Sequence, residues 1–332
     1  MITPIDSTSL DLLTRPQPRL PQLKEWLFQE VWTSKRFQDC GGTPSAYLNS
    51  GEKLVNEAES LITAAADSYL GELIAARASA RPLVEFLKQQ NKPAAIVLDG
   101  CSIREMPKFL ELAQASHRPV LECTYGCSAI PSTTELFIND RLGLNLPPIG
   151  PSQMVSRREL MQSGIRYHFF QNPSESQYIP DGPGPILIWH RFPDLRFMDS
   201  TASSAEFYDG IWDSLEMVWQ RTVQALPASS QILVTSDHGY VFFGPGLSDI
   251  NLDRKDRPLK GKRFYEFPAD EPMPQEDAAL FIDQERRLAA VKGRYHNRPQ
   301  GPHPAQSLYR HGGVSLMEVL TPWLVLGPMG EL

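Results

Sequence analysis

Between residues 22 and 90, apolar residues recur at intervals of three and four, which is the spacing of an amphipathic helix. Three stretches carry the pattern: 23–32 (LKEWLFQEVW), 52–78 (EKLVNEAESLITAAADSYLGELIAARA) and 80–90 (ARPLVEFLKQQ). No group of residues suited to hold a ligand falls within them. The pattern predicts an N-terminal helical region over residues 1–92, and the sequence does not indicate its function.

After Pro93 the pattern changes to short, continuous apolar runs, which are typical of strands buried on both faces. They are 94–100 (AAIVLDG), 185–194 (PILIWHRFPD) and 230–240 (SQILVTSDHGY), and an amphipathic helix is expected over 207–226. Strand, helix, strand in this order favours an α/β fold. In such a fold we expect a mostly parallel central sheet that helices cover on both faces. A last strand is expected near 321–327. We therefore predict a second unit over residues 93–332.

The three apolar runs share one feature, because each of them ends on an aspartate. These residues are Asp99, Asp194 and Asp237. In open parallel sheets, ligands bind outside the carboxyl ends of the strands. A ligand site is therefore expected where the three carboxylates meet.

Net charge, apolar runs and cysteine count limit which kinds of protein this chain can be. The chain has 332 residues, 41% of them hydrophobic, and a formal net charge of -7 at pH 7. This charge argues against a protein that coats nucleic acid through a general positive field. No apolar run approaches the ~20 residues of a membrane helix, and the first residues lack a signal pattern. We expect a cytoplasmic protein with no membrane partner, and its four cysteines are expected to be reduced thiols.

One basic segment stands out against the negative net charge. Six basic residues lie within positions 254–263. A solvated charged loop is the usual structure of such a run. A loop that steers anions is the alternative.

Carboxylates and imidazoles together form the candidate site, beside a hydroxyl-rich turn at 131–134 (PSTT). The candidate metal ligands are Asp99, Asp194, Asp237, His238 and His311. Oxygen and nitrogen ligands of this kind suit a divalent ion such as zinc or manganese. Such an ion neutralises phosphate oxygens and activates a bound hydroxyl. Each residue alone has a structural alternative, since Asp caps helices and His forms buried hydrogen bonds.

The order of these segments resembles that of the PglZ domain family, a branch of the alkaline-phosphatase superfamily. The matching pieces are VLDG (97–100), IPSTT (130–134), FPD (192–194), TSDHGY (235–240) and HGGVSLMEVLTPWLVL (311–326). The last is the most specific, because PglZ domains similarly end on His-Gly-Gly, a helix and a strand that contains proline. The resemblance covers about residues 93–327 and leaves the helical region outside.

The resemblance implies an alkaline-phosphatase-like fold and a hydroxyl nucleophile beside a metal ion. Carried onto this chain, the nucleophile is Thr134, and Ser132 in the same turn is a possible second hydroxyl. The residues around the first metal would be Asp99, Thr134, Asp237 and His238. A helix that begins after the turn would help to hold a phosphoryl group. Ser102 is a further hydroxyl near the site, although the family does not place its nucleophile there.

A second metal would take Asp194 and His311, and here the chain departs from the family. Superfamily members usually carry a histidine four residues after that aspartate, whereas this chain has Met198. Methionine is a weak ligand for zinc or manganese. His190 is a possible replacement, because residues 190, 192 and 194 share one face if the strand continues that far. One or two metal ions are therefore compatible with the sequence.

Two functions remain open. The first is a metal-dependent phosphatase or phosphodiesterase that acts on a phosphate ester, with a nucleotide or nucleic acid among the candidate substrates. The resemblance also implies protein partners in a bacterial phage-defence system. The second is a catalytically degenerate PglZ-like domain that serves as a structural or nucleotide-sensing component of such a complex, and Met198 favours it.

Overall fold

The structure is a computed structural model, and it describes most of the chain. The described residues are 20–65, 68–80, 82–89, 93–175, 179, 182–198, 202–247, 250–251, 263–296 and 308–329. The expected basic segment lies outside them except for Arg263, which is buried. Within the described residues, no helix combines the length and the apolar character needed to cross a membrane.

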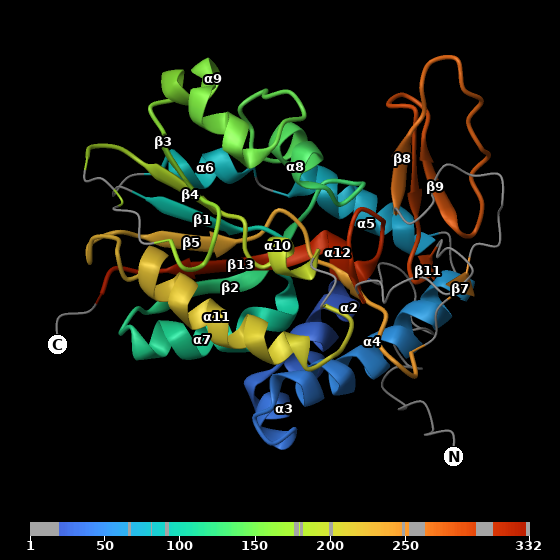
Figure 1. Cartoon of the computed structure of the whole chain (residues 1–332), viewed down its shortest axis with the longest axis horizontal. Helices are drawn as coiled ribbons and strands as arrows, with labels where there is room; N and C mark the ends of the chain where they lie inside the picture. The colour runs from blue at the N-terminus through green and yellow to red at the C-terminus, as the bar shows by residue number, and fades with distance from the viewer. Residues whose placement is uncertain are drawn as a thin grey trace.

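A six-stranded mixed sheet forms the centre of the molecule, as Figure 1 shows. Its order is β2 (Val120–Cys127), β13 (Leu320–Leu326), β5 (Ile232–Thr235), β1 (Ala94–Leu98), β4 (Ile186–His190) and β3 (Arg166–Phe170). The neighbours β5, β1, β4 and β3 pair in parallel, whereas β13 is antiparallel to both β5 and β2. The expected α/β class with a mostly parallel sheet is confirmed.

The reversed direction of β13 follows from where its chain enters the sheet. The short helix α12 (Leu316–Val319) leads straight into β13, with no connecting loop. Leu320, the first residue of β13, pairs with Cys127, the last residue of β2. β13 therefore begins beside the carboxyl ends of the parallel strands and runs in the opposite direction to them.

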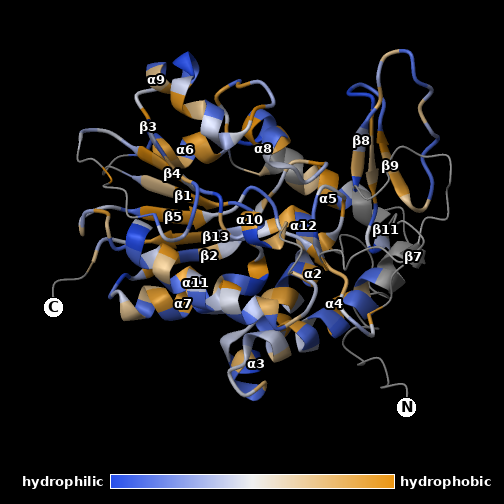
Figure 2. Cartoon of the chain, viewed as in Figure 1, coloured by the Kyte–Doolittle hydropathy of each residue, from blue (hydrophilic) through white to orange (hydrophobic). Residues whose placement is uncertain are grey.

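Helices cover both faces of this sheet. Alternate residues of β1 point to opposite faces, so Ile96 joins one apolar cluster and Val97 the other. The first cluster includes residues of α7 (Met106–Ala115) and α11 (Phe207–Thr222), and the second includes residues of α6 (Leu83–Leu87), α8 (Thr134–Asp140) and α9 (Arg158–Gln162). In Figure 2 the strands of the sheet are largely hydrophobic, while α7 and α11 alternate between hydrophobic and hydrophilic residues.

The predicted N-terminal helical region is present. It comprises α2 (Leu20–Trp26), a π-helical turn η1 (Leu27–Val31), α3 (Ser34–Asp39), α4 (Pro44–Ala65) and α5 (Ser68–Ser79). Buried residues of α4 and η1 belong to the same apolar cluster as one face of the central sheet. Residues 20–79 therefore share a core with the unit that begins at residue 93.

The remaining elements lie in the connections between the strands of the main sheet. Short helical turns are η2 (Ile103–Glu105), η3 (Pro151–Ser156) and α10 (Asp194–Phe197). The connection from β5 to β13 holds an antiparallel sheet of β8 (Phe264–Glu266), β10 (Leu288–Val291) and β9 (Leu280–Asp283), on the right of Figure 1. Two further pairs are β6 (Val241–Phe242) with β12 (Tyr309–Arg310), and β7 (Ile250–Asn251) with β11 (Tyr295–His296).

Candidate metal and nucleophile site

The three aspartates of the apolar runs meet at the carboxyl edge of the sheet. Asp99 directly follows β1, Asp237 follows β5 by two residues, and Asp194 begins α10. The backbone N–H of Asp194 donates to the carbonyl oxygen of Asp99 at 2.9 Å, and that of Gly100 donates to Asp237 Oδ1 at 3.1 Å. Gly100 has a φ of +77°, and a Cβ there would lie 2.9 Å from the Cβ of Asp194. The Asp-Gly turn thus allows this close approach.

Thr134 brings a hydroxyl into the same group. It is the first residue of α8, in the connection that follows β2. Its Oγ1 lies 2.6 Å from Asp237 Oδ2, 3.4 Å from Asp99 Oδ1 and 3.4 Å from His238 Nε2. The hydroxyl therefore faces two carboxylates and one imidazole.

His238 connects two sets of possible metal ligands. Its Nε2 lies 3.5 Å from Asp99 Oδ1 and 3.5 Å from Asp237 Oδ2. Its ring stacks on that of His311 with centroids 4.0 Å apart, and His311 Nε2 lies 3.3 Å from Asp194 Oδ1. The sets are therefore Asp99, Asp237 and His238, and Asp194, His238 and His311, each with ligand atoms within 4.8 Å of one another.

The backbone fixes which nitrogen of His238 faces the carboxylates. Its Nδ1 lies 3.0 Å from the carbonyl oxygen of Gly239. A carbonyl only accepts hydrogen bonds, so Nδ1 carries the hydrogen of this bond. In the neutral ring, Nε2 then presents its lone pair to Asp99 and Asp237. This is the tautomer that a metal-binding histidine needs.

The charges of the site favour a cation. Burial raises the pKa of Asp99 well above its usual value, and the neighbouring Asp237 and Asp194 raise it further. Burial lowers the pKa of His238, but the charges of Asp237 and Asp194 outweigh this effect, and the net shift is upward. Burial and the nearby His238 lower the pKa of His311. A divalent ion among these groups would offset the repulsion between the carboxylates.

Ser132 makes structural hydrogen bonds. Its hydroxyl donates to the carbonyl oxygen of Gly313 at 3.0 Å and accepts the backbone N–H of Gly312 at 3.0 Å. Its own carbonyl oxygen lies 3.4 Å from His311 Nδ1. Ser132 therefore joins the turn that holds Thr134 to the segment that holds His311.

His190 does not meet the condition on which its candidacy rested. The strand had to continue to residue 194, but β4 ends at His190 and α10 begins at Asp194. His190 Nδ1 accepts the backbone N–H of Phe192 at 3.2 Å, and the ring stacks on Phe170. Burial lowers the pKa of His190 to about 3. The residue thus packs as a buried histidine and neither candidate set includes it, so nothing in the described contacts adds support to the prediction that it is a ligand.

The other two positions singled out in the sequence have different surroundings. Met198 follows α10, its side chain is 66% exposed, and its backbone N–H donates to the carbonyl oxygen of Asp194. Ser102 is buried and caps η2, where its hydroxyl donates to Glu105 Oε2 at 2.9 Å. Ser102 thus has a local structural role.

Two residues near the site were missed in the sequence. Trp189 Nε1 donates to Asp99 Oδ2 at 3.3 Å, and no local pattern indicates this contact. Glu318 is fully buried and accepts the backbone N–H of Gly313 at 2.9 Å. A signal for Glu318 existed, because a lone carboxylate in the apolar stretch SLMEVLTPWLVL needs a buried partner.

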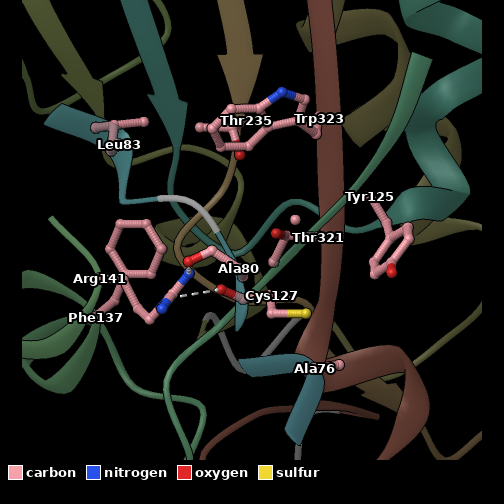
Figure 3. A pocket seen from close by; sticks show the side chains of 11 residues that line it. Ala76, Ala80, Leu83, Tyr125, Cys127, Phe137, Arg141, Thr235, Thr321 and Trp323 are labelled. Atoms are coloured by element: carbon pink, nitrogen blue, oxygen red, sulfur yellow. Dashed lines mark hydrogen bonds between the residues drawn. The ribbon is translucent and has the colours of Figure 1, made fainter. Parts of the chain in front are cut away.

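A cavity of about 170 Å³ lies on the face of the sheet that α8 covers, and Figure 3 shows its lining. Its charged residue is Arg141, which donates from Nε to the carbonyl oxygen of Cys127 at 3.3 Å and from Nη2 to that of Ala80 at 2.8 Å. Thr235 Oγ1 donates to the carbonyl oxygen of Pro322. None of the candidate ligands lines this cavity, so we do not place the substrate in it.

Comparisons with solved structures find distant likenesses to this chain. No family model matches it, PglZ included, and neither does any curated protein. Murine ectonucleotide pyrophosphatase/phosphodiesterase 5 is similar, with 13% identity, a TM-score of 0.43, and 70% of this chain and 87% of that chain covered. Phosphonoacetate hydrolase from Sinorhizobium meliloti 1021 is similar with 12% identity, a TM-score of 0.41, and 71% and 90% covered. Likenesses this distant carry no argument about activity.

Proposed function

We propose that this protein is a metal-dependent phosphoester hydrolase of the PglZ branch of the alkaline-phosphatase superfamily, with Thr134 as its nucleophile. The observation that carries the proposal is the position of Thr134 Oγ1. It lies within 3.4 Å of Asp99, Asp237 and His238, and these three residues are a set that fits one metal ion. A hydroxyl needs such surroundings to become a nucleophile at neutral pH.

Asp99, Asp237 and His238 would hold the first ion, which is zinc or manganese by the chemistry of the donors. When bound, it would polarise the phosphoryl group and lower the pKa of the threonine hydroxyl. Asp237 Oδ2 is placed to accept the hydroxyl proton, because Thr134 Oγ1 lies 2.6 Å away. Thr134 Oγ1 then attacks phosphorus, the ester oxygen leaves with its electron pair, and water later hydrolyses the phosphothreonine.

Asp194 and His311 would hold a second ion, whereas the single lone pair of His238 Nε2 serves the first. The histidine that superfamily members usually add is replaced by Met198, whose side chain points into solvent. With His238 on the first ion, two ligand atoms remain in this set, one fewer than the three protein ligands that are typical of a catalytic metal site.

A second candidate function rests on the same departure from the family. If the second set holds no ion, the leaving oxygen loses a stabilising charge, and turnover becomes slow. The protein would then act as a structural or nucleotide-sensing component. Nucleotide or nucleic-acid substrates and partners from a phage-defence system are proposals that rest on the resemblance of the motifs. A cytoplasmic location is a proposal that rests on the sequence pattern.

The test is a comparison of variants of the PSTT turn with a model phosphomonoester and a model phosphodiester. Thr134→Val preserves shape and removes the hydroxyl, so we expect loss of turnover by about a thousandfold or more, since removal of a nucleophile has effects of that size. Thr134→Ser retains a hydroxyl and should retain part of the activity. Equal turnover in wild type and Thr134→Val would refute the assignment.

The control is Thr133→Ser, which preserves the hydroxyl that caps α8. It should leave turnover near that of the wild type. Ser132→Ala is unsuitable as a control because of the contacts that Ser132 makes. Its hydroxyl binds Gly312 and Gly313 beside His311.

A further inference from the structure

The α12 turn lies against both segments that carry the candidate histidines. It begins after Ser315, whose hydroxyl accepts the backbone N–H of Glu318 at 3.3 Å. All four residues of α12 are buried, including the carboxylate of Glu318, which has no exposed surface. A buried carboxylate requires hydrogen bonds or an opposite charge to offset its lost hydration.

Arg263 supplies that charge and fixes the orientation of the Glu318 side chain. Its Nε lies 2.7 Å from Glu318 Oε1, and its Nη2 lies 2.8 Å from Oε2. The guanidinium also donates to the carbonyl oxygens of Tyr295 and Gly293, at 2.7 Å each. Both oxygens of Glu318 are therefore held in one geometry, as in other bidentate pairs of arginine and carboxylate.

The segment of His311 is tied to this pair through Gly313. Its backbone N–H donates to Glu318 Oε1 at 2.9 Å. A Cβ on Gly313 would lie 2.6 Å from Arg263 Nη2, so only a glycine fits between the chain and the guanidinium. The contact lies two residues from His311.

The segment of His238 is tied to the same turn through Gly239. Its backbone N–H donates to the carbonyl oxygen of Glu318 at 2.9 Å. A Cβ on Gly239 would lie 2.1 Å from the carbonyl oxygen of Met317. This contact adjoins His238 and its hydrogen bond from Nδ1 to the carbonyl of Gly239.

We propose that Glu318 is a positioning residue that holds His238 and His311 in register, so that both rings serve one metal centre. The inference rests on the proposed function. Its carboxylate holds the backbone N–H of Gly313, and its backbone carbonyl oxygen holds that of Gly239. Partners outside the ligand shell orient metal ligands, and their loss typically weakens metal binding by about 10–100-fold.

The experiment compares Glu318→Gln with Glu52→Gln. Glu52 is a matched control, because it is equally buried and pairs with Arg104 and Arg294 without contacting either glycine. Titration with Co²⁺ followed by absorbance gives the affinity, and the nuclear Overhauser effect between the two imidazole rings of the metal-free protein gives their stacking. We expect Glu318→Gln to bind Co²⁺ about 10–100-fold more weakly and to lose the ring-to-ring effect. Glu52→Gln should retain both.

Wild-type affinity and an unchanged ring-to-ring effect in Glu318→Gln would overturn the proposal, as would equal losses in the control. Should Glu318→Gln fail to fold, Arg263→Lys replaces it, because it retains the positive charge and loses the bidentate geometry. If the wild type binds no Co²⁺, the proposed function fails. The ring-to-ring effect then decides the positioning role alone.

Discussion

At the scale of single residues, the site depends on close backbone contacts as much as on its ligands. Gly239 follows His238, and a side chain there would collide with the backbone of α12. Gly100 follows Asp99 and adopts a backbone conformation that other residues rarely take. The motifs DG and DHG therefore combine a candidate ligand with the glycine that lets neighbouring segments approach.

Gly239→Ala should be destabilising and should weaken metal binding. The added Cβ would lie 2.1 Å from the Met317 carbonyl oxygen, and overpacking of this kind costs about 1–3 kcal/mol. Gly210→Ala is the control, because Gly210 is exposed on α11 and a Cβ added there would have no neighbouring atom within 4 Å. It should stabilise the protein by about 0.5–1 kcal/mol. Thermal unfolding of both variants checks this, and equal melting temperatures would contradict it.

At the scale of elements, α4 shows that a periodic pattern of apolar residues does not reveal which carboxylates of a helix are buried. The spacing of apolar residues predicted a helix there, and the polar residues of an amphipathic helix usually face water. Instead, Glu52 is fully buried and binds Arg104 Nε at 2.7 Å and Arg294 Nη2 at 2.5 Å. Glu59 accepts the backbone N–H of Leu316 at 2.8 Å. Partners this distant in sequence leave no local signal.

Glu52→Ala should lower the free energy of unfolding by about 3–5 kcal/mol, the usual cost of leaving a buried charge without its partner. Two guanidinium groups lose their shared carboxylate in this variant. Glu57 lies on the exposed face of the same helix, and Glu57→Ala should change stability by less than about 0.5 kcal/mol. Urea unfolding measures both. A similar loss for Glu52 and Glu57 would show that the buried network contributes little.

The central strands were the most predictable elements, because a buried parallel strand leaves a continuous apolar run. All three runs correspond to strands of the sheet, and their aspartates converge. The antiparallel direction of β13 was not predicted, since it depends on the position of α12 at the site. The small sheet of β8, β10 and β9 was also missed, because its strands are short and belong to long connections.

At the scale of the whole molecule, the N-terminal helices and the sheet form one packed body. Leu48 and Val55 of α4 share an apolar cluster with Ile96 of β1. The backbone and hydroxyl of Ser45 donate to Asp209 of α11. The boundary expected at residue 92 therefore marks a change of pattern in the sequence. Residues on both sides of it pack into one apolar core.

A fragment of residues 93–332 should not fold to a native state. The loss of α4 uncovers one face of the core and leaves Arg104 and Arg294 without Glu52. The free energy of unfolding of a domain is only about 5–15 kcal/mol, so we expect that the apolar contacts of α4 and the ion pairs of Glu52 cannot both be lost without unfolding. We expect no cooperative thermal transition and poor dispersion of amide resonances. A fragment that unfolds cooperatively would show that the helical region is an independent domain.

We propose above that Asp99, Asp237 and His238 hold a metal ion that activates Thr134. The most direct test is the rate at which the protein hydrolyses a model phosphoester after treatment with a chelator, before and after zinc or manganese is restored. We expect no turnover without metal and recovery when it is added. We expect no recovery in Asp237→Asn, which loses a proposed ligand and the acceptor 2.6 Å from the hydroxyl. Turnover that survives removal of the metal, or that returns equally in Asp237→Asn, would contradict it.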